Sequence, residues 1–342
     1  MNKRDVGVDI LKFIAAILVV LLHFDFLSDV NVKLGLIREV FTGLAVPFFF
    51  TCSGYYFFKH IYNKDAVERR RYIKKYFLRL LKPFLIWGGC YIICTLVAGT
   101  FIDHVGLIEI FTSKVKTFIF ESPGGGLWYI HVLLLILILI YVTPSNRAIK
   151  AWAFVFLISY IVTSVWYTEA VCGDLFVYLK KLYLMIYSSE ESIWYQGVYF
   201  FVGCFCYEYF KEINNRRRTL AVLIMSFFVY FILYLFRIHY YLYSIGRLML
   251  ILLSALLLVY SLSCYKNVEY HKLPYVISNA GKISTVIYFT HFLTIYASKF
   301  VASLLNIKFE NFSSLFCIIS LVILVSYSCF VSSRNKIYKL LY

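Results

Sequence analysis

Long apolar runs separated by short polar segments follow one another along almost the whole chain. A helix needs about 20 apolar residues to cross about 30 Å of hydrocarbon. Backbone groups in lipid need partners within their own segment, and the runs lack the in-out alternation of a membrane barrel, so we expect helices. The pattern predicts an all-α, polytopic membrane helix bundle with about ten spans, near residues 6–26, 40–59, 83–102, 127–143, 151–168, 193–210, 219–237, 245–264, 283–301 and 313–332.

The composition supports a membrane protein and excludes a soluble one. Of the 342 residues, 62% are hydrophobic and 15% are charged, and the mean hydropathy is +0.78. A soluble domain is roughly 45–50% apolar and about 25% charged. A water-soluble chain of this size could not bury so much apolar surface. We therefore expect a multi-pass protein of the cell (plasma or inner) membrane that contacts membrane lipids.

The excess of basic residues predicts the orientation of the chain. The net charge is +16, from 34 Lys and Arg against 18 Asp and Glu, and in a soluble protein it would suggest a nucleic-acid partner. Here most of the basic residues lie in short loops, and positive loops stay in the cytoplasm. With the N-terminus inside, 23 Lys and Arg lie inside and 10 outside, and Lys12 in the first span completes the 34. The bias predicts an N-in/C-in topology and no nucleic-acid partner.

The nine cysteines predict neither a metal site nor a disulfide framework. Eight of them lie within apolar runs, where cysteine behaves as a small hydrophobic residue. No pair or Cys/His cluster has the spacing of a zinc site.

The first span contains three ionisable residues, Asp9, Lys12 and His23, each costing about 2.5–3.5 kcal/mol on insertion scales. Lys12 and His23 are eleven residues apart. At 100° per residue this is about 20° past three turns, so the two share a helix face, roughly 16–17 Å apart. Asp9, three residues before Lys12, is a candidate counter-ion.

Two interpretations fit this stripe. In one, Lys12 extends to the inner headgroups and His23 is an interfacial histidine. In the other, His23 is a general base inside a cavity of the bundle, since histidine is the side chain most easily tuned to act near neutral pH. Lys12 would then hold an anion at the other end of the same face.

Further polar positions recur at span ends and inside spans. Pro47 and Gly54 predict a kinked, closely packed second helix. Arg79 and Lys82 lie three residues apart on one face, which suits phosphate or anionic headgroups. Trp128 fits an outer aromatic belt.

Two further candidates, a single histidine and a group of basic residues, lie later in the chain. His291 lies in the middle of the ninth span, where it should face protein or water, and a structural hydrogen bond is its simplest role. Arg237, His239 and Arg247 surround a short outer loop, where they would receive an acidic or sugar acceptor.

Short motifs follow one another from Asp9-Ile10-Leu11-Lys12 with His23 to Ile287-Tyr288 with His291. The ordered set resembles the acyltransferase-3 family of multi-pass bacterial membrane proteins. The motifs cover essentially all ten predicted spans. The family often has arginine where Lys12 and Lys82 stand, and lysine keeps the charge but loses the bidentate fork. The motifs are Asp9-Ile10-Leu11-Lys12 with His23, Val46-Pro47-Phe48-Phe49-Phe50 with Ser53-Gly54-Tyr55, Arg79 to Pro83, Leu127-Trp128-Tyr129, and Ile287-Tyr288 with His291.

The resemblance implies a single transmembrane acyltransferase domain over residues 1–342. It implies an O-acetyltransferase that moves an acyl group, most often acetyl, from cytoplasmic acetyl-CoA to a hydroxyl of a surface or lipid-linked glycan, with no metal. It implies that His23 is the catalytic base and that Lys12, Arg79 and Lys82 bind the donor. The expected supporting residues are Asp9, Ser53, Tyr55, Trp128 and His291.

A transporter of an amino acid, a sugar or a lipid-linked glycan is the alternative, because ten helices with buried polar groups suit it as well. Transporters usually show paired broken helices that arise from an internal repeat, and no such repeat is visible in the sequence. A non-catalytic member of a glycan-assembly complex is a further alternative. The pattern leaves open the acceptor sugar, the choice between acetyl and succinyl, and the oligomeric state.

Overall fold

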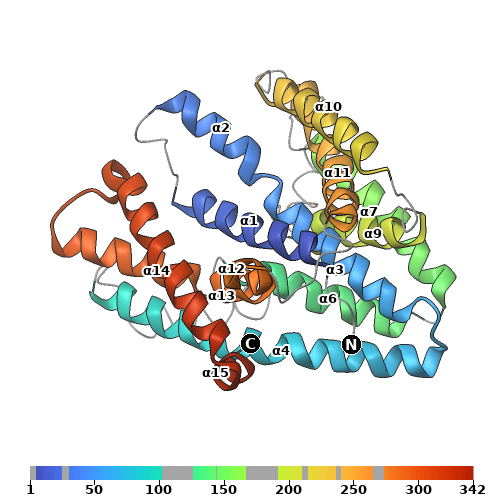
Figure 1. The fold of residues 1–342 in the computed structure, drawn as a ribbon, viewed down its shortest axis with the longest axis horizontal. Coiled ribbons are helices and arrows are strands. Elements are labelled where there is room, and N and C mark those ends of the chain that lie inside the picture. Colours follow the sequence, from blue (N-terminus) through green and yellow to red (C-terminus); the bar gives the residue numbers. More distant parts are fainter. Residues whose placement is uncertain are drawn as a thin grey trace, which may run out of the picture. The chain divides into compact units, whose positions relative to one another are not determined.

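The described part of the computed structural model is helical (Figure 1). It comprises residues 5–24, 31–101, 126–143, 145–166, 192–209, 215–235, 240–264 and 273–341. Its elements are α1 (Val6–His23), α2 (Val32–Thr42), α3 (Ala45–Ile61), α4 (Ala66–Phe101), α6 (Trp128–Val142), α7 (Asn146–Trp166), α9 (Ile193–Tyr209), α10 (Arg216–Leu235), α11 (Tyr240–Ser263), α12 (Tyr275–Ser278), α13 (Ala280–Leu304), the 3₁₀ helix η2 (Phe309–Phe312), α14 (Ser313–Ser333) and α15 (Asn335–Leu341).

The prediction of an all-α, multi-pass membrane protein is confirmed. Within the described ranges, seven segments are long and apolar enough to cross a membrane. Each overlaps one of the ten predicted spans, although the third begins at Ala66 and not near residue 83. They are Val6–His23, Leu34–Ile61, Ala66–Leu96, Arg147–Ser164, Arg216–Leu235, Ile245–Ser263 and Ser313–Ser333. The N-in/C-in topology stays a prediction.

The other three predicted spans are also helices, but they differ from a full apolar span. α6 has 15 residues and α9 has 17. α13 is longer, with 25 residues, and it buries polar side chains among its apolar ones, including Ser284, Thr290 and His291. Because this helix packs against protein along much of its length, it can carry polar side chains. These side chains lower its hydropathy below that of a lipid-facing span.

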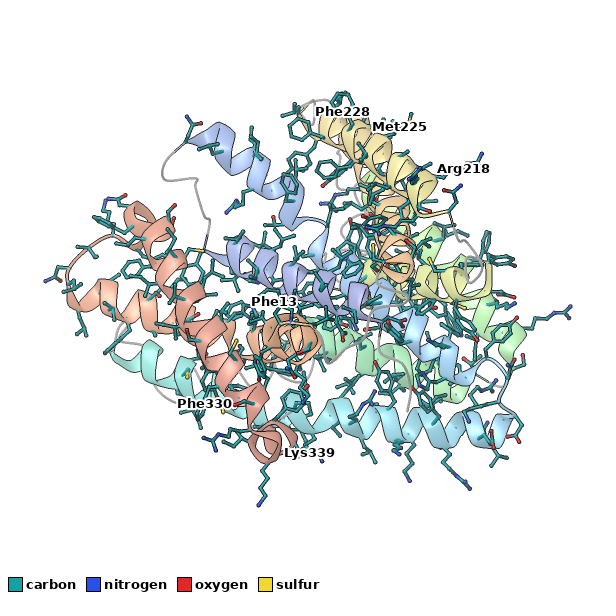
Figure 2. The ribbon with its side chains drawn as sticks, in the orientation of Figure 1. Phe13, Arg218, Met225, Phe228, Phe330 and Lys339 are labelled. Carbon is teal, nitrogen blue, oxygen red and sulfur yellow. The ribbon has the colours of Figure 1, made fainter. Side chains whose placement is uncertain are left out.

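α10 is a helix that exposes apolar side chains over most of its surface. Met225 is 69% exposed and Phe228 is 62% exposed, and Figure 2 shows both projecting away from the ribbon. Arg218, in the first turn, is also exposed. A helix with so large an exposed apolar surface suits an apolar solvent, which agrees with the span predicted for this segment.

The helices divide into two compact units. Unit 1 comprises residues 1–8, 46–75 and 135–267, and unit 2 comprises residues 9–45, 76–134 and 268–342. In unit 1, α7, α9 and α11 contact one another and α10 packs on α11. In unit 2, α13 packs on α14, and α14 contacts α15 and η2.

α4 changes the picture of the basic residues between the second and third predicted spans, 40–59 and 83–102, which were expected to lie in a loop. The helix begins at Ala66 and continues through Pro83 to Phe101. Its first turn is capped by Asp65, whose Oδ1 accepts a hydrogen bond from the Glu68 backbone N–H at 2.8 Å. The residues that follow are mostly Arg, Lys, Tyr and Leu, and the long Arg, Lys and Leu side chains favour helix, so the basic segment lies on a helix rather than a loop.

Arg69, one of the basic residues of this segment, is buried rather than solvated. Its side chain is 3% exposed, and Nη2 donates a hydrogen bond to the Thr143 carbonyl oxygen at 3.2 Å. That carbonyl belongs to the residue that follows α6, where the last carbonyls of a helix lack partners within the helix. Arg69 therefore caps the C-terminal end of α6, a role that its position in a basic run did not reveal.

The buried network of unit 1 corrects the placement of Arg247 at an outer loop. Arg247 lies inside α11, 8% exposed, and Nη1 donates to the Tyr195 hydroxyl at 2.8 Å. The Tyr160 hydroxyl donates to the Arg247 carbonyl oxygen and pairs with the Tyr199 hydroxyl at 2.7 Å. This network joins α7, α9 and α11. Arg237 and His239 lie outside the described residues.

α3 begins at Ala45, so Pro47 lies in its first turn and not at a kink. The N–H groups of the first turn have no partner within the helix, so proline is tolerated there. Gly54 lies where α3 meets α9: a Cβ at this position would collide with the backbone of Phe200. Gly203 of α9 meets the backbone of Thr51 in the same way. The expected close helix approach at Gly54 is confirmed.

We expect Gly54→Ala to destabilise unit 1. The added methyl group meets backbone atoms that cannot move aside as a side chain can, and overpacking of this kind costs about 1–3 kcal/mol. Gly246→Ala is the matched control, because the nearest atom, the Leu233 Cβ, lies at an ordinary 3.7 Å. Thermal unfolding of the two variants in detergent should show a loss for Gly54→Ala alone. Equal midpoints would contradict the close contact.

Candidate active site

α1 presents Lys12 and His23 on a face that packs against protein. The helix is continuous from Val6 to His23, so the eleven-residue spacing keeps both residues on that face. Between them, Ala16 is 1% exposed and Val19 is 6% exposed. Lys12 and His23 are themselves half-buried.

His23 stacks on a second histidine, His291 of α13. The ring centroids are 5.4 Å apart and the ring planes are inclined by 28°. Phe292 packs edge-on against both rings, with centroid distances of 4.6 Å to His23 and 4.7 Å to His291. All three residues belong to unit 2. The structure therefore brings together two predicted site residues from the first and ninth predicted spans.

The tautomer of His291 follows from its backbone partner. Nδ1 lies 2.6 Å from the Tyr288 carbonyl oxygen. A carbonyl oxygen only accepts, so Nδ1 carries the hydrogen and the lone pair is on Nε2. His291 is 0% exposed, and among the described residues no group hydrogen bonds to Nε2. His291 thus presents a fixed, buried acceptor atom beside His23.

Aromatic side chains of α4 pack against the same part of α13. The Tyr91 hydroxyl donates to the Phe289 carbonyl oxygen, and the Tyr91 ring meets Phe292 edge-on at 6.1 Å. Trp87 stacks on Phe289 at 6.3 Å. These contacts hold Phe292, and through it the two imidazoles, in an apolar surrounding where electrostatic interactions are strong.

Gly126, two residues before α6, closes one side of His291. A Cβ there would lie 2.5 Å from the Phe292 Cδ2 and 2.9 Å from the His291 Cε1. Only glycine lets the backbone come this close. Gly126 is not among the predicted site residues, although a glycine run directly before a helix is a sequence signal of close backbone approach.

Asp9 lies at the first turn of α13. A Cβ on Gly281 would be 2.6 Å from its Oδ1. A carboxylate near a helix N-terminus is stabilised by the aligned peptide dipoles, so Asp9 helps position the helix that carries His291. The pairing of Asp9 with Lys12 stays a prediction.

Arg79 and Lys82 are exposed on α4, in the same unit as the two histidines. The Lys82 Nζ donates to the carbonyl oxygen of Lys339 in α15 at 3.0 Å, and Figure 2 shows the Lys339 side chain extending outward. The Arg79 guanidinium lies over the Tyr76 ring at 4.8 Å. Both cations therefore lie on the surface of the described structure.

The remaining predicted residues are divided between the units. Trp128 starts α6 and is half-buried in unit 2. Ser53 and Tyr55 lie on α3 in unit 1, where Tyr55 is 6% exposed and packs against Tyr207. Within the described residues, no cluster of three or more His, Cys, Asp or Glu could hold a metal.

These features define a polytopic helical membrane protein with two imidazoles packed together inside it. The chain belongs to the acyltransferase-3 family: the family model described as an acyltransferase domain matches residues 5–331. That match confirms the family to which the motifs pointed.

Two curated proteins of Enterococcus faecalis, both named amino-acid racemase, are also similar. One is 25% identical over 244 residues, which cover 68% of this chain and 33% of the relative. The other is 23% identical over 236 residues, which cover 64% of this chain and 29% of the relative. The chain thus spans about a third of the length of these relatives. No solved structure matches.

Proposed function

We propose that the protein is an O-acyltransferase that moves an acetyl group from cytoplasmic acetyl-CoA to a hydroxyl of a surface or lipid-linked glycan. One observation carries the proposal: a chain of this family packs the half-buried His23 against His291 inside a helical bundle. The imidazole is the side chain best suited to exchange protons near neutral pH.

His23 acts as the general base. It takes the proton of the acceptor hydroxyl as the hydroxyl oxygen attacks the thioester carbonyl carbon. The tetrahedral intermediate then expels the thiolate of coenzyme A, which takes the proton back from His23. Protons and charges balance over this cycle, and the products are the acetyl ester and free coenzyme A.

Lys12, Arg79 and Lys82 bind the phosphates of the donor. Phosphates are recognised by Arg and Lys side chains, and the three cations all lie in unit 2 with His23. The separation of about 16–17 Å between Lys12 and His23 along α1 suits an extended donor whose nucleotide stays near the cytoplasm. The basic segment on α4 also attracts a polyanionic donor over a longer range.

Release of free thiol from acetyl-CoA is the primary test. Purified protein in lipid vesicles should release thiol when an acceptor is present, and mass spectrometry should find acetyl esters on the acceptor. Surface polysaccharide from cells with and without the protein should differ by the same ester. Absence of both signals would contradict the proposal, and an unchanged surface glycan from cells carrying His23→Ala would favour a non-catalytic role.

Lys12→Ala should raise the KM for acetyl-CoA more than the KM for the acceptor. The substitution removes one charge from the donor phosphates and leaves the reacting atoms in place, so we expect a rise of about ten-fold for the donor. Steady-state thiol release with each substrate varied in turn measures both constants. Equal effects on the two substrates would contradict a phosphate role for Lys12.

Transport of an amino acid is the second candidate. The two similar proteins are both named amino-acid racemase. If the segment that they share with this chain handles their amino acid, this chain would carry an amino acid across the membrane. Uptake of labelled amino acids into vesicles, with no thiol released from acetyl-CoA, would favour it. Thiol release without uptake would favour the acyltransferase.

A further inference from the structure

We infer that His291 contacts the acceptor directly, and that its Nε2 accepts a hydrogen bond from the hydroxyl next to the one that His23 deprotonates. The site then selects acceptors with neighbouring hydroxyls, as in sugars, over alcohols with one. This inference rests on the proposed acyl transfer and adds a substrate class to it.

The orientation of the His291 ring is the first step. Because Nδ1 donates to the Tyr288 carbonyl oxygen, Nε2 is committed to accepting and does not donate a proton. A buried acceptor is costly when it has no partner. No group in the described part of the chain supplies that partner. A ligand hydroxyl is a donor of the right kind.

The relation of the two rings is the second step. Stacked rings do not point their in-plane lone pairs at one another, so the two histidines do not satisfy each other. Their centroids lie 5.4 Å apart, a separation that two hydroxyls on neighbouring carbons can bridge through hydrogen bonds about 2.8 Å long. Phe292 contacts both rings, with interplanar angles of 60° and 63°. A diol with one hydroxyl at each ring would contact both imidazoles at once.

The cost of a missing hydroxyl provides the selectivity. A site built to hydrogen bond a substrate hydroxyl rejects an analogue that lacks it, because the buried protein atom is then left without a partner. His23 is only half-buried and can be solvated. His291 is fully buried, so it is the member of the pair that discriminates.

The test compares two small acceptors of equal ring size, cis-cyclohexane-1,2-diol and cyclohexanol, in the acetyl-CoA thiol-release assay. His291→Phe keeps a ring against His23 and removes the Nε2 lone pair. His291→Gln places an amide oxygen near the position of Nε2. His131→Phe is the matched control, since His131 of α6 stacks on Phe84 in the same unit and lies outside the site.

Wild-type protein and His131→Phe should favour the diol in kcat/KM by at least about ten-fold. In His291→Phe the preference should fall to about the two-fold set by the number of hydroxyls, and His291→Gln should recover part of it. Equal rates for both acceptors in the wild-type protein, or parallel losses for both in His291→Phe, would overturn the inference.

A binding measurement separates this inference from the proposed function. In saturation-transfer NMR, the diol should bind the wild-type protein more tightly than cyclohexanol, and His291→Phe should lose that difference. Transfer without discrimination would overturn the inference alone. Discrimination in binding without any thiol release would overturn the acyl transfer and keep the diol site. If neither acyl transfer nor discrimination between the two acceptors were observed, the inference and the proposed function would both be overturned.

Discussion

Replacing His23 with alanine should abolish acyl transfer while the protein stays folded in the membrane. General-base catalysis contributes about 10²–10⁴-fold to a rate. The neighbouring His291 does not substitute for His23, because packing against Phe292 and the hydrogen bond from Nδ1 to the Tyr288 carbonyl oxygen hold its ring, and therefore its Nε2, in a fixed place. Loss of the His23 ring also removes a stacking partner of His291 and Phe292. Thiol release from acetyl-CoA with purified protein in vesicles measures the effect.

The control is His60→Ala. His60 is an exposed histidine of α3 in unit 1 that stacks on Tyr72, so it reports what the loss of an imidazole does in general. Size-exclusion profiles in detergent should match the wild-type protein for both variants. Activity retained in His23→Ala, or lost equally in His60→Ala, would remove His23 from the reaction.

The membrane class and most of the spans could be predicted, because the energetics of a lipid-facing helix depend on its own residues. Each of the ten apolar runs contains a helix in the described residues, and seven of the runs lie in segments long and apolar enough to cross a membrane. The helical start of α4 does not follow from hydropathy. Hydropathy cannot separate a charged helix outside the membrane from a charged loop, although the helix formers near Glu68 and the cap at Asp65 were visible locally.

One part of the candidate site could be predicted from local sequence, and the other part could not. The alignment of Lys12 with His23 follows from the helical period alone, since both lie on α1. The contact between His23 and His291 depends on how α1 packs against α13, and helix propensity and hydropathy carry no term for that packing. The hydrogen bond of Arg69 also depends on packing, because its partner, the Thr143 carbonyl oxygen, lies at the end of a different helix, α6. The order of the motifs predicts His291 as a site residue, but its contact with His23 is visible only in the tertiary structure.

Gly126→Ala should reduce acyl transfer by about 10²-fold, the order expected when reacting groups shift by about 1 Å. The added methyl group would sit 2.5 Å from the Phe292 ring and 2.9 Å from the His291 Cε1. Phe292 contacts both imidazoles and is backed by Tyr91, so it cannot yield without moving them. The damage should appear in kcat, because the donor cations on α1 and α4 are left in place.

Gly89→Ala separates this steric effect from a general cost of adding a methyl group to unit 2. Gly89 lies within α4, and a Cβ there would meet no atom within 4 Å. Alanine in a helix interior is favoured over glycine by about 0.5–1 kcal/mol, so this variant should unfold at the same or a higher temperature with full activity. If the two alanine variants behaved alike, Gly126 would not hold His291 in place. A selective loss in Gly126→Ala that spares donor binding would show that the backbone before α6 sets the position of His291 and Phe292 beside His23.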